Sequence, residues 1–147
     1  LNYFVIITNF YIEFELYKLE QQGKGKVFNA PIDVYLSEEN TFQPDLIFII
    51  TERLSIIGKK KIEGPPDIVI EILSPRTAYY DLRQKKHVYE EYGVKEYWIV
   101  DPMAQRIDIY RNKGKKYLPF RSVVKTGEIS SGLLKDFTIN LKTLFSE

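Results

Sequence analysis

Glu71 is the side chain that departs most clearly from its surroundings. It lies in the run 67–73, where all the remaining residues after Asp67 are Ile, Val or Leu. Strand alternation places Glu71 on the face opposite Ile70 and Ile72. A carboxylate in such a run is costly unless it is paired, hydrogen-bonded or bound to a cation, so Glu71 is a candidate metal ligand. The alternative is an edge strand on which Glu71 faces water.

A second carboxylate is needed to hold a metal ion, and Asp45 is the preferred candidate. It follows Pro44 and precedes the apolar run 46–50, although Pro-Asp is also a common turn starter. Asp67 lies on the same strand as Glu71, about 13 Å away, whereas metal–oxygen bonds are about 2.0–2.6 Å long. Asp67 is therefore expected at the entry to the strand. Asp45 lies on another strand that pairing can bring beside Glu71, and Asp33 competes for the same place.

Lys85 is the third unusual residue. Helical spacing puts it on one stripe with Leu82 and Tyr89, which is expected to face the core. Its ammonium either reaches the acidic site or extends to solvent in an i,i+4 pair with Asp81. Acids on adjacent strands and a lysine on the next helix predict one common site.

Composition restricts the chemistry of that site. The chain has 147 residues, no Cys, one His, and 21 Lys and Arg against 20 Asp and Glu. Disulfides, thiolate zinc sites and multi-histidine sites are excluded, so a metal would bind carboxylates, which favours hard cations such as magnesium, manganese or calcium. The net charge of +1 gives no overall attraction to nucleic acid. The length and the hydrophobic fraction of 44% predict one globular domain over residues 1–147.

The periodicity predicts a layered fold. The N-terminal helix, which ends near Gly23, is expected to bury a stripe comprising Ile7, Phe10, Tyr11, Phe14, Tyr17 and Lys18 or Leu19. A hairpin is expected from the runs 32–36 and 42–50, and a second helix from about residue 78 to 92. Strands are expected at 67–73, 97–100, 107–110 and 117–124, with a short strand or helix in 132–145. This order indicates an α/β or α+β fold with one central mixed sheet.

The apolar N-terminus does not predict a membrane anchor. Polar residues interrupt it, no basic residues precede it, and no small-residue cleavage site follows. We expect a cytoplasmic protein without a membrane span.

Several motifs together resemble the Uma-type putative restriction endonuclease family of the PD-(D/E)XK nuclease superfamily. They are GPPDIVIEILSP at 64–75, then Thr77, Asp81, Lys85 and Tyr89, then GVKEYWIVDP at 93–102, with upstream matches at 30–34 and 43–46. The resemblance covers roughly residues 23–145. It implies a restriction-endonuclease-like core, a central mixed β-sheet flanked by helices.

The resemblance also assigns roles to residues. Asp45 matches the first metal-binding aspartate of the superfamily and Glu71 its second acidic ligand. The superfamily usually has Lys two positions after the Glu, where this chain has Leu73, but the family carries its lysine on the next helix, at Lys85. Family members usually begin with several tens of residues that include an acidic segment. We therefore expect this chain to lack an N-terminal segment.

The implied function is a metal-dependent endonuclease that hydrolyses DNA. Asp45, Glu71 and the backbone carbonyl of Ile72 would hold Mg²⁺ or Mn²⁺, and Lys85 would orient the attacking water. Supporting roles fall to Asp81, Tyr89 and Asp33. The alternative is a catalytically silent nuclease-fold module for DNA binding or interaction, and the sequence does not separate DNA from RNA.

Two basic loops and the N-terminal helix provide further candidate surfaces. The loop residues could contact nucleic-acid phosphates or could simply be solvated: Lys59, Lys60, Lys61, Arg111, Lys113, Lys115 and Lys116. Exposed apolar surface around the N-terminal helix would suit a homodimer.

Overall fold

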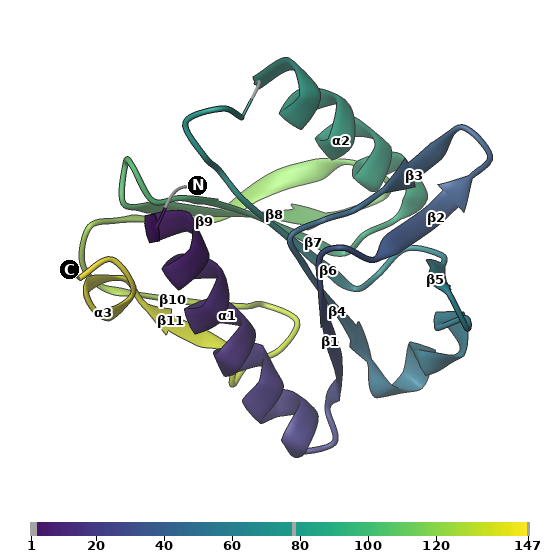
Figure 1. Ribbon diagram of the computed structural model, residues 1–147, viewed down its shortest axis with the longest axis horizontal. Coiled ribbons are helices and arrows are strands. Elements are labelled where there is room, and N and C mark those ends of the chain that lie inside the picture. Colours follow the sequence, from purple (N-terminus) through teal and green to yellow (C-terminus); the bar gives the residue numbers. More distant parts are fainter. Residues whose placement is uncertain (1–2, 78, 147) are drawn as a thin grey trace.

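A six-stranded mixed sheet forms the centre of the structure, a computed structural model that describes residues 3–77 and 79–146 (Figure 1). The strand order is β1 (Gly25–Asn29), β4 (Leu46–Ile50), β6 (Ile68–Ile72), β7 (Glu96–Asp101), β8 (Arg106–Asn112) and β9 (Tyr117–Val124). β6 and β7 run parallel, with α2 (Tyr79–Tyr92) as their crossover, and the other neighbouring pairs are antiparallel. The predicted α+β fold with a central mixed sheet is confirmed.

Two apolar cores cover the two faces of this sheet. One lies under α1 (Tyr3–Gln21) and includes residues from β10 (Glu128–Ser130), β11 (Thr138–Asn140) and α3 (Leu141–Leu144). The other lies under α2 and includes residues from a small sheet of β2 (Asp33–Ser37), β3 (Asn40–Phe42) and β5 (Lys61–Glu63). A 3₁₀ helix, η1 (Thr51–Ile56), follows β4. Among the described residues, no helix combines the length and apolarity needed to cross a bilayer.

The central strand β6 is buried on both faces. Ile68, Ile70 and Ile72 belong to the core under α1, while Val69 belongs to the core under α2. Glu71 shares the face of Val69 by alternation and is only 5% exposed. Because β6 lies between β4 and β7, the alternative of an exposed edge strand is wrong.

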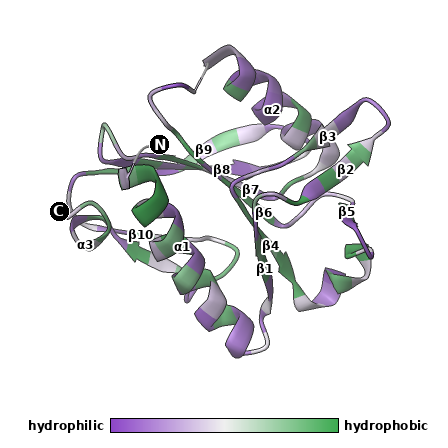
Figure 2. Ribbon diagram, viewed as in Figure 1, coloured by the Kyte–Doolittle hydropathy of each residue, from purple (hydrophilic) through white to green (hydrophobic). Residues whose placement is uncertain are grey.

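The N-terminal helix forms as expected but buries a different stripe. Thr8, Ile12, Leu16 and Leu19 are buried, whereas Phe10 and Phe14 are 65% and 59% exposed. Apolar residues occupy several faces of α1, and the visible side of its first turns is hydrophobic (Figure 2). Periodicity therefore could not decide which stripe meets the sheet.

The expected hairpin is divided between two sheets. β3 pairs with β2, as predicted, but β4 pairs with β1 and β6 in the main sheet. The break falls at Gln43-Pro44-Asp45, where proline has no N–H to continue a ladder. This change of sheet puts Asp45 directly before β4, beside the end of β6.

Two further buried carboxylates are fully engaged in structural bonds. Asp67 precedes β6, as expected, and its Oδ1 lies 2.9 Å from Lys95 Nζ and 3.1 Å from an Arg53 nitrogen. It also accepts a hydrogen bond from the amide of Ile50. Glu96 accepts hydrogen bonds from Trp98 Nε1, Ser131 Oγ and the amides of Gly132 and Leu133. These bonds leave neither side chain available as a ligand.

Candidate active site

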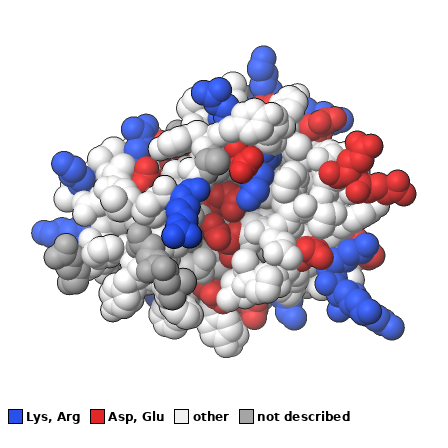
Figure 3. Space-filling view, turned by 45° about the horizontal axis from the view of Figure 1, so that its top comes forward, with Lys and Arg blue, Asp and Glu red and all other residues white. Residues whose placement is uncertain are grey.

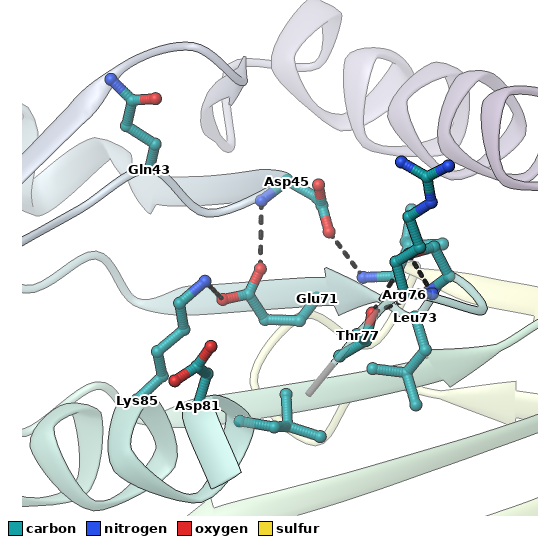
Figure 4. A pocket seen from close by; sticks show the side chains of 11 residues that line it. Gln43, Asp45, Glu71, Leu73, Arg76, Thr77, Asp81 and Lys85 are labelled. Atoms are coloured by element: carbon teal, nitrogen blue, oxygen red, sulfur yellow. Dashed lines mark hydrogen bonds and ion pairs between the residues drawn. The ribbon is translucent and has the colours of Figure 1, made fainter. Parts of the chain in front are cut away.

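Asp45 and Glu71 lie side by side on neighbouring antiparallel strands. The register pairs Leu46 with Ile70, so Asp45 meets the end of β6. The amide of Asp45 donates to Glu71 Oε1 at 3.3 Å, and the amide of Ile72 donates to Asp45 Oδ2 at 2.7 Å (Figure 4). The acid pair predicted from the sequence is therefore formed by strand pairing.

The two carboxylates line a cavity of about 330 Å³. The start of β4, the end of β6, the following loop and the first turns of α2 enclose it. The lining residues are Gln43, Asp45, Glu71, Ile72, Leu73, Ser74, Arg76, Thr77, Asp81, Leu82 and Lys85. The space-filling view shows acidic side chains in a hollow, with basic side chains close by (Figure 3).

Helix α2 directs Lys85 and Tyr89 at Glu71. Lys85 Nζ lies 3.6 Å from Glu71 Oε2, and the Tyr89 hydroxyl donates to the same oxygen at 3.4 Å. The two residues are one helical turn apart, so they present their polar ends to the same place. The ion-pair partner of Lys85 is Glu71, while Asp81 lines the cavity one turn earlier.

Burial determines the protonation of this cluster. Desolvation raises the pKa of Glu71 to about 7; the Lys85 charge opposes this shift, and the Asp45 charge adds to it. Desolvation also raises the pKa of Asp45, against the Ile72 hydrogen bond and the Lys85 charge. Burial and the nearby Glu71 charge raise the pKa of Tyr89, so its hydroxyl is a neutral donor. The surroundings therefore disfavour the ionised form of both acids, and a bound cation would restore it.

This donor set fits a hard divalent cation that keeps part of its water shell. Mg²⁺ is typically bound by one or two carboxylates together with waters and substrate oxygens. The Ile72 amide points toward Asp45, and the carbonyl of the same strand residue shares that edge. Among residues 3–77 and 79–146, no cluster of three or more His, Cys, Asp or Glu could form a metal site. Asp45, Glu71 and the carbonyl of Ile72 are therefore the oxygen ligands that lie together at this edge.

Asp33 does not compete with Asp45 for the site. Its Oδ1 accepts a hydrogen bond of 2.9 Å from Gln43 Nε2, and Gln43 lines the cavity while Asp33 does not. Among the described residues, Gln43 links Asp33 to the cavity.

Neither predicted basic loop lines the cavity. Lys59, Lys60 and Lys61 line a separate hollow, and Lys61 Nζ lies 4.2 Å from the centre of the Tyr35 ring. Arg111 pairs with Glu96 at one end of β7, whereas Glu71 pairs with Ile99 near the other end. The turn with Lys113, Lys115 and Lys116 extends beyond Arg111, away from the acid pair. These residues remain predicted phosphate contacts, at a distance from the acids.

Sequence reasoning missed Arg76 and Gln43, which both line the cavity. One signal was present for each residue. Arg76 lies in the loop directly after the strand that carries Glu71, and Gln43 is two residues before Asp45. Chain proximity to the acids could have identified both.

The mixed sheet with its parallel β6–α2–β7 unit agrees with the restriction-endonuclease-like core expected from the sequence. An acid pair lies on its adjacent strands, and a lysine lies on the crossover helix. The chain belongs to the Uma2 family, described as "Putative restriction endonuclease", whose model matches residues 4–142. This match confirms the family resemblance seen in the sequence.

A solved structure shares the fold. It is described as a putative nuclease belonging to DUF820 from Anabaena variabilis ATCC 29413. The TM-score is 0.79 at 17% identity, over 99% of this chain and 82% of that chain. No curated protein matches the chain.

Proposed function

We propose that this protein is a metal-dependent endonuclease that hydrolyses phosphodiester bonds in DNA. The observation that carries the proposal is the pair of half-buried Asp45 and buried Glu71, with Lys85 Nζ 3.6 Å from Glu71. Structural carboxylates are usually neutralised, as Asp67 is by Arg53 and Lys95. Glu71 instead keeps a raised pKa beside an open cavity, which is typical of functional sites.

Asp45, Glu71 and the carbonyl of Ile72 would hold Mg²⁺ or Mn²⁺ in this proposal. When bound, such a cation polarises the phosphate and lowers the pKa of a coordinated water. Lys85 holds its ammonium at the acid pair, where it orients the attacking water and stabilises charge that develops on phosphate oxygens. Tyr89 would hold the Glu71 carboxylate in place by its hydrogen bond, and Asp81, one helical turn before Lys85 on the cavity wall, would help to keep the ammonium there.

The direct test is a cleavage panel with plasmid DNA, DNA oligonucleotides and RNA oligonucleotides, each with Mg²⁺, Mn²⁺ or EDTA. We expect metal-dependent cleavage of DNA by the wild type and none by Glu71→Ala. Glu91→Ala, at an exposed position of the same helix that carries Lys85, is the matched control and should cleave normally. Full activity of Glu71→Ala, with folding verified by circular dichroism, would refute the assignment.

A silent nuclease-fold binding module is the second candidate. The observation in its favour is that the described residues hold no cluster of three or more His, Cys, Asp or Glu side chains that could bind a metal ion. Saturable Mn²⁺ binding that Glu71→Gln abolishes supports the enzyme. Nucleic-acid binding with neither metal affinity nor cleavage supports the module.

We also propose that the protein acts as a homodimer through the exposed face of α1. Ile7, Phe10, Phe14 and Tyr17 are 41%, 65%, 59% and 46% exposed and follow one another at helical steps of three or four. A two-fold dimer would present two sites, which suits cleavage of both strands. Light scattering should give a dimer mass for the wild type and a monomer mass for Phe10→Asp. A monomeric wild type would refute the dimer.

A further inference from the structure

Two basic side chains line the acidic cavity, but they are in different electrostatic situations. Lys85 forms an ion pair with Glu71. The guanidinium of Arg76 makes no hydrogen bond or ion pair with any described residue, although Arg76 lines the same cavity. Figure 4 shows the two on different sides of the acid pair, Lys85 beside Glu71 and Arg76 nearer Asp45. The guanidinium of Arg76 is therefore an unpaired positive charge on the side of the cavity opposite Lys85.

A hydrogen-bonded turn holds the backbone of Arg76 in place. The amide of Ser74 donates to Thr77 Oγ1 at 2.9 Å, and the amide of Thr77 donates to the Ser74 carbonyl at 3.0 Å. The amide of Arg76 itself lies 3.3 Å from Ser74 Oγ and donates to it. Pro75 also restricts the turn by fixing its own φ. The chain enters this turn directly from Ile72 and Leu73. Arg76 therefore follows shortly after Ile72, whose amide donates to Asp45.

The charge of the lining shows what this arginine adds. Three acidic and two basic side chains surround the cavity. A divalent cation on the acid pair would make the lining net positive with Arg76 and neutral without it. A phosphodiester is anionic, so Arg76 decides whether the metal-loaded cavity attracts its substrate. The planar guanidinium fork also matches the geometry of two phosphate oxygens better than an ammonium does.

We infer that Arg76 is a substrate-binding residue that grips a backbone phosphate of the nucleic acid at the Asp45 side of the cavity. This inference rests on the proposed nuclease function and assigns different roles to the two basic residues of the cavity. Lys85, held at Glu71, acts where the bond breaks, whereas Arg76 binds the strand. Loss of Arg76 therefore raises KM more than it lowers kcat.

Binding is measured with a fluorescent DNA oligonucleotide in Ca²⁺, over a series of salt concentrations. Arg76→Gln should weaken binding about tenfold or more, because a charged hydrogen-bonded contact is lost. It should also reduce the slope of log K against log salt by about one. Arg76→Lys should keep the wild-type salt slope and bind more tightly than Arg76→Gln. The reason is that lysine retains the positive charge but lacks the planar guanidinium.

Arg83→Gln is the matched control, since Arg83 is exposed on α2 and does not line the cavity. It should bind like the wild type. Equal losses for Arg76→Gln and Arg83→Gln would overturn the inference, because they would indicate diffuse electrostatic attraction. Wild-type affinity and salt slope in Arg76→Gln would overturn it as well, as would a wild-type protein that binds no DNA.

A cleavage assay in Mg²⁺ separates this inference from the proposed function. If DNA binding depends on Arg76 but no DNA is cleaved, the nuclease proposal is refuted and the role of Arg76 in phosphate binding is retained. If Arg76→Gln cleaves DNA normally with an unchanged KM, the nuclease proposal is retained and the role of Arg76 in phosphate binding is refuted.

Discussion

The amide of Ile72 lies 2.7 Å from Asp45 Oδ2 and donates a hydrogen bond to it. Asp45 in turn donates its own amide to Glu71 Oε1. Backbone amides at the end of a strand pair thus position the two acids relative to each other, while Lys85 and Tyr89 contact the other oxygen of Glu71. Asp45 lines the cavity, and its Oδ1 makes no hydrogen bond or ion pair with a described residue, so this oxygen is available to a ligand.

Glu71→Gln should weaken Mn²⁺ binding at least tenfold, because an amide replaces the charged ligand at nearly unchanged volume. The same variant should be more stable than the wild type in metal-free buffer at pH 8, since it removes an ionised group that burial disfavours. Calorimetric titration and urea denaturation measure the two effects. Glu91→Gln should change neither. A metal-free Glu71→Gln protein that is less stable at pH 8 would contradict the electrostatic account.

The metal-free protein should lose stability as the pH rises from about 4.5 to about 7. Burial raises the pKa of Glu71 from 4.5 to about 7, so in this window the folded state retains a proton that the unfolded chain has released. The loss attributable to Glu71 is at most on the order of 3 kcal/mol. The raised pKa of Asp45 acts in the same direction.

Urea denaturation of wild type and Glu71→Gln between pH 4.5 and 8 isolates the Glu71 contribution. The wild type should lose stability relative to the variant as the pH rises. Mn²⁺ affinity of the wild type should increase over the same range, because protons and metal compete for the carboxylate. A difference in stability that is independent of pH would show that Glu71 has an ordinary pKa.

Lys85→Met should lower the rate of DNA cleavage about 100-fold or more, the effect expected for loss of a positioned electrostatic group. Lys86→Met is the control: Lys86 Nζ lies 3.6 Å from the centre of the Tyr110 ring, away from Glu71. Its cleavage rate should stay within about twofold of the wild type, because it lies outside the site. Single-turnover kinetics at saturating DNA compare the three proteins. Equal loss in both variants would indicate a general effect of helix charge.

Asp67→Asn should destabilise the protein by about 3 kcal/mol, because it breaks a buried carboxylate's pairing with the partly exposed Arg53 and Lys95. Mn²⁺ affinity should be unchanged, since Asp67 lies at the other end of β6 from Ile72. Urea denaturation and calorimetric titration measure stability and affinity separately. A loss of metal affinity in the folded variant would place Asp67 in the metal site and contradict the structure.

Local sequence pattern determined much of the fold and the centre of the site. Alternation along β6 put Glu71 opposite Ile70 and Ile72, and helical spacing put Lys85 and Tyr89 on one stripe. These assignments succeed because strand and helix periods depend on neighbouring residues alone. Composition likewise restricted the ligands to oxygen, since the chain has no Cys and one His.

Only the tertiary structure decided which surfaces meet. It buried Ile12 and Leu16 of α1 and left Phe10 exposed, although both stripes are apolar. It also divided the expected hairpin at Pro44 and so brought Asp45 to β6. Such outcomes depend on strand register and on competition between distant apolar surfaces, and neither is encoded in a local period.

The basic residues also show the difference between what the local sequence predicts and what the tertiary structure decides. The sequence offered Lys59–Lys61 and Arg111–Lys116 as conspicuous basic runs, but sheet pairing and loop position keep both out of the acidic cavity. Arg76, a single arginine after Pro75, enters that cavity because its turn follows β6 directly. The sequence by itself determined which side chains could do the chemistry. The pairing of β4 with β6 brought Asp45 to Glu71, and the path of the chain from β6 into α2 brought Arg76 and Lys85 to the same cavity. The first is a long-range contact and the second depends on how α2 packs, so neither follows from a local sequence period.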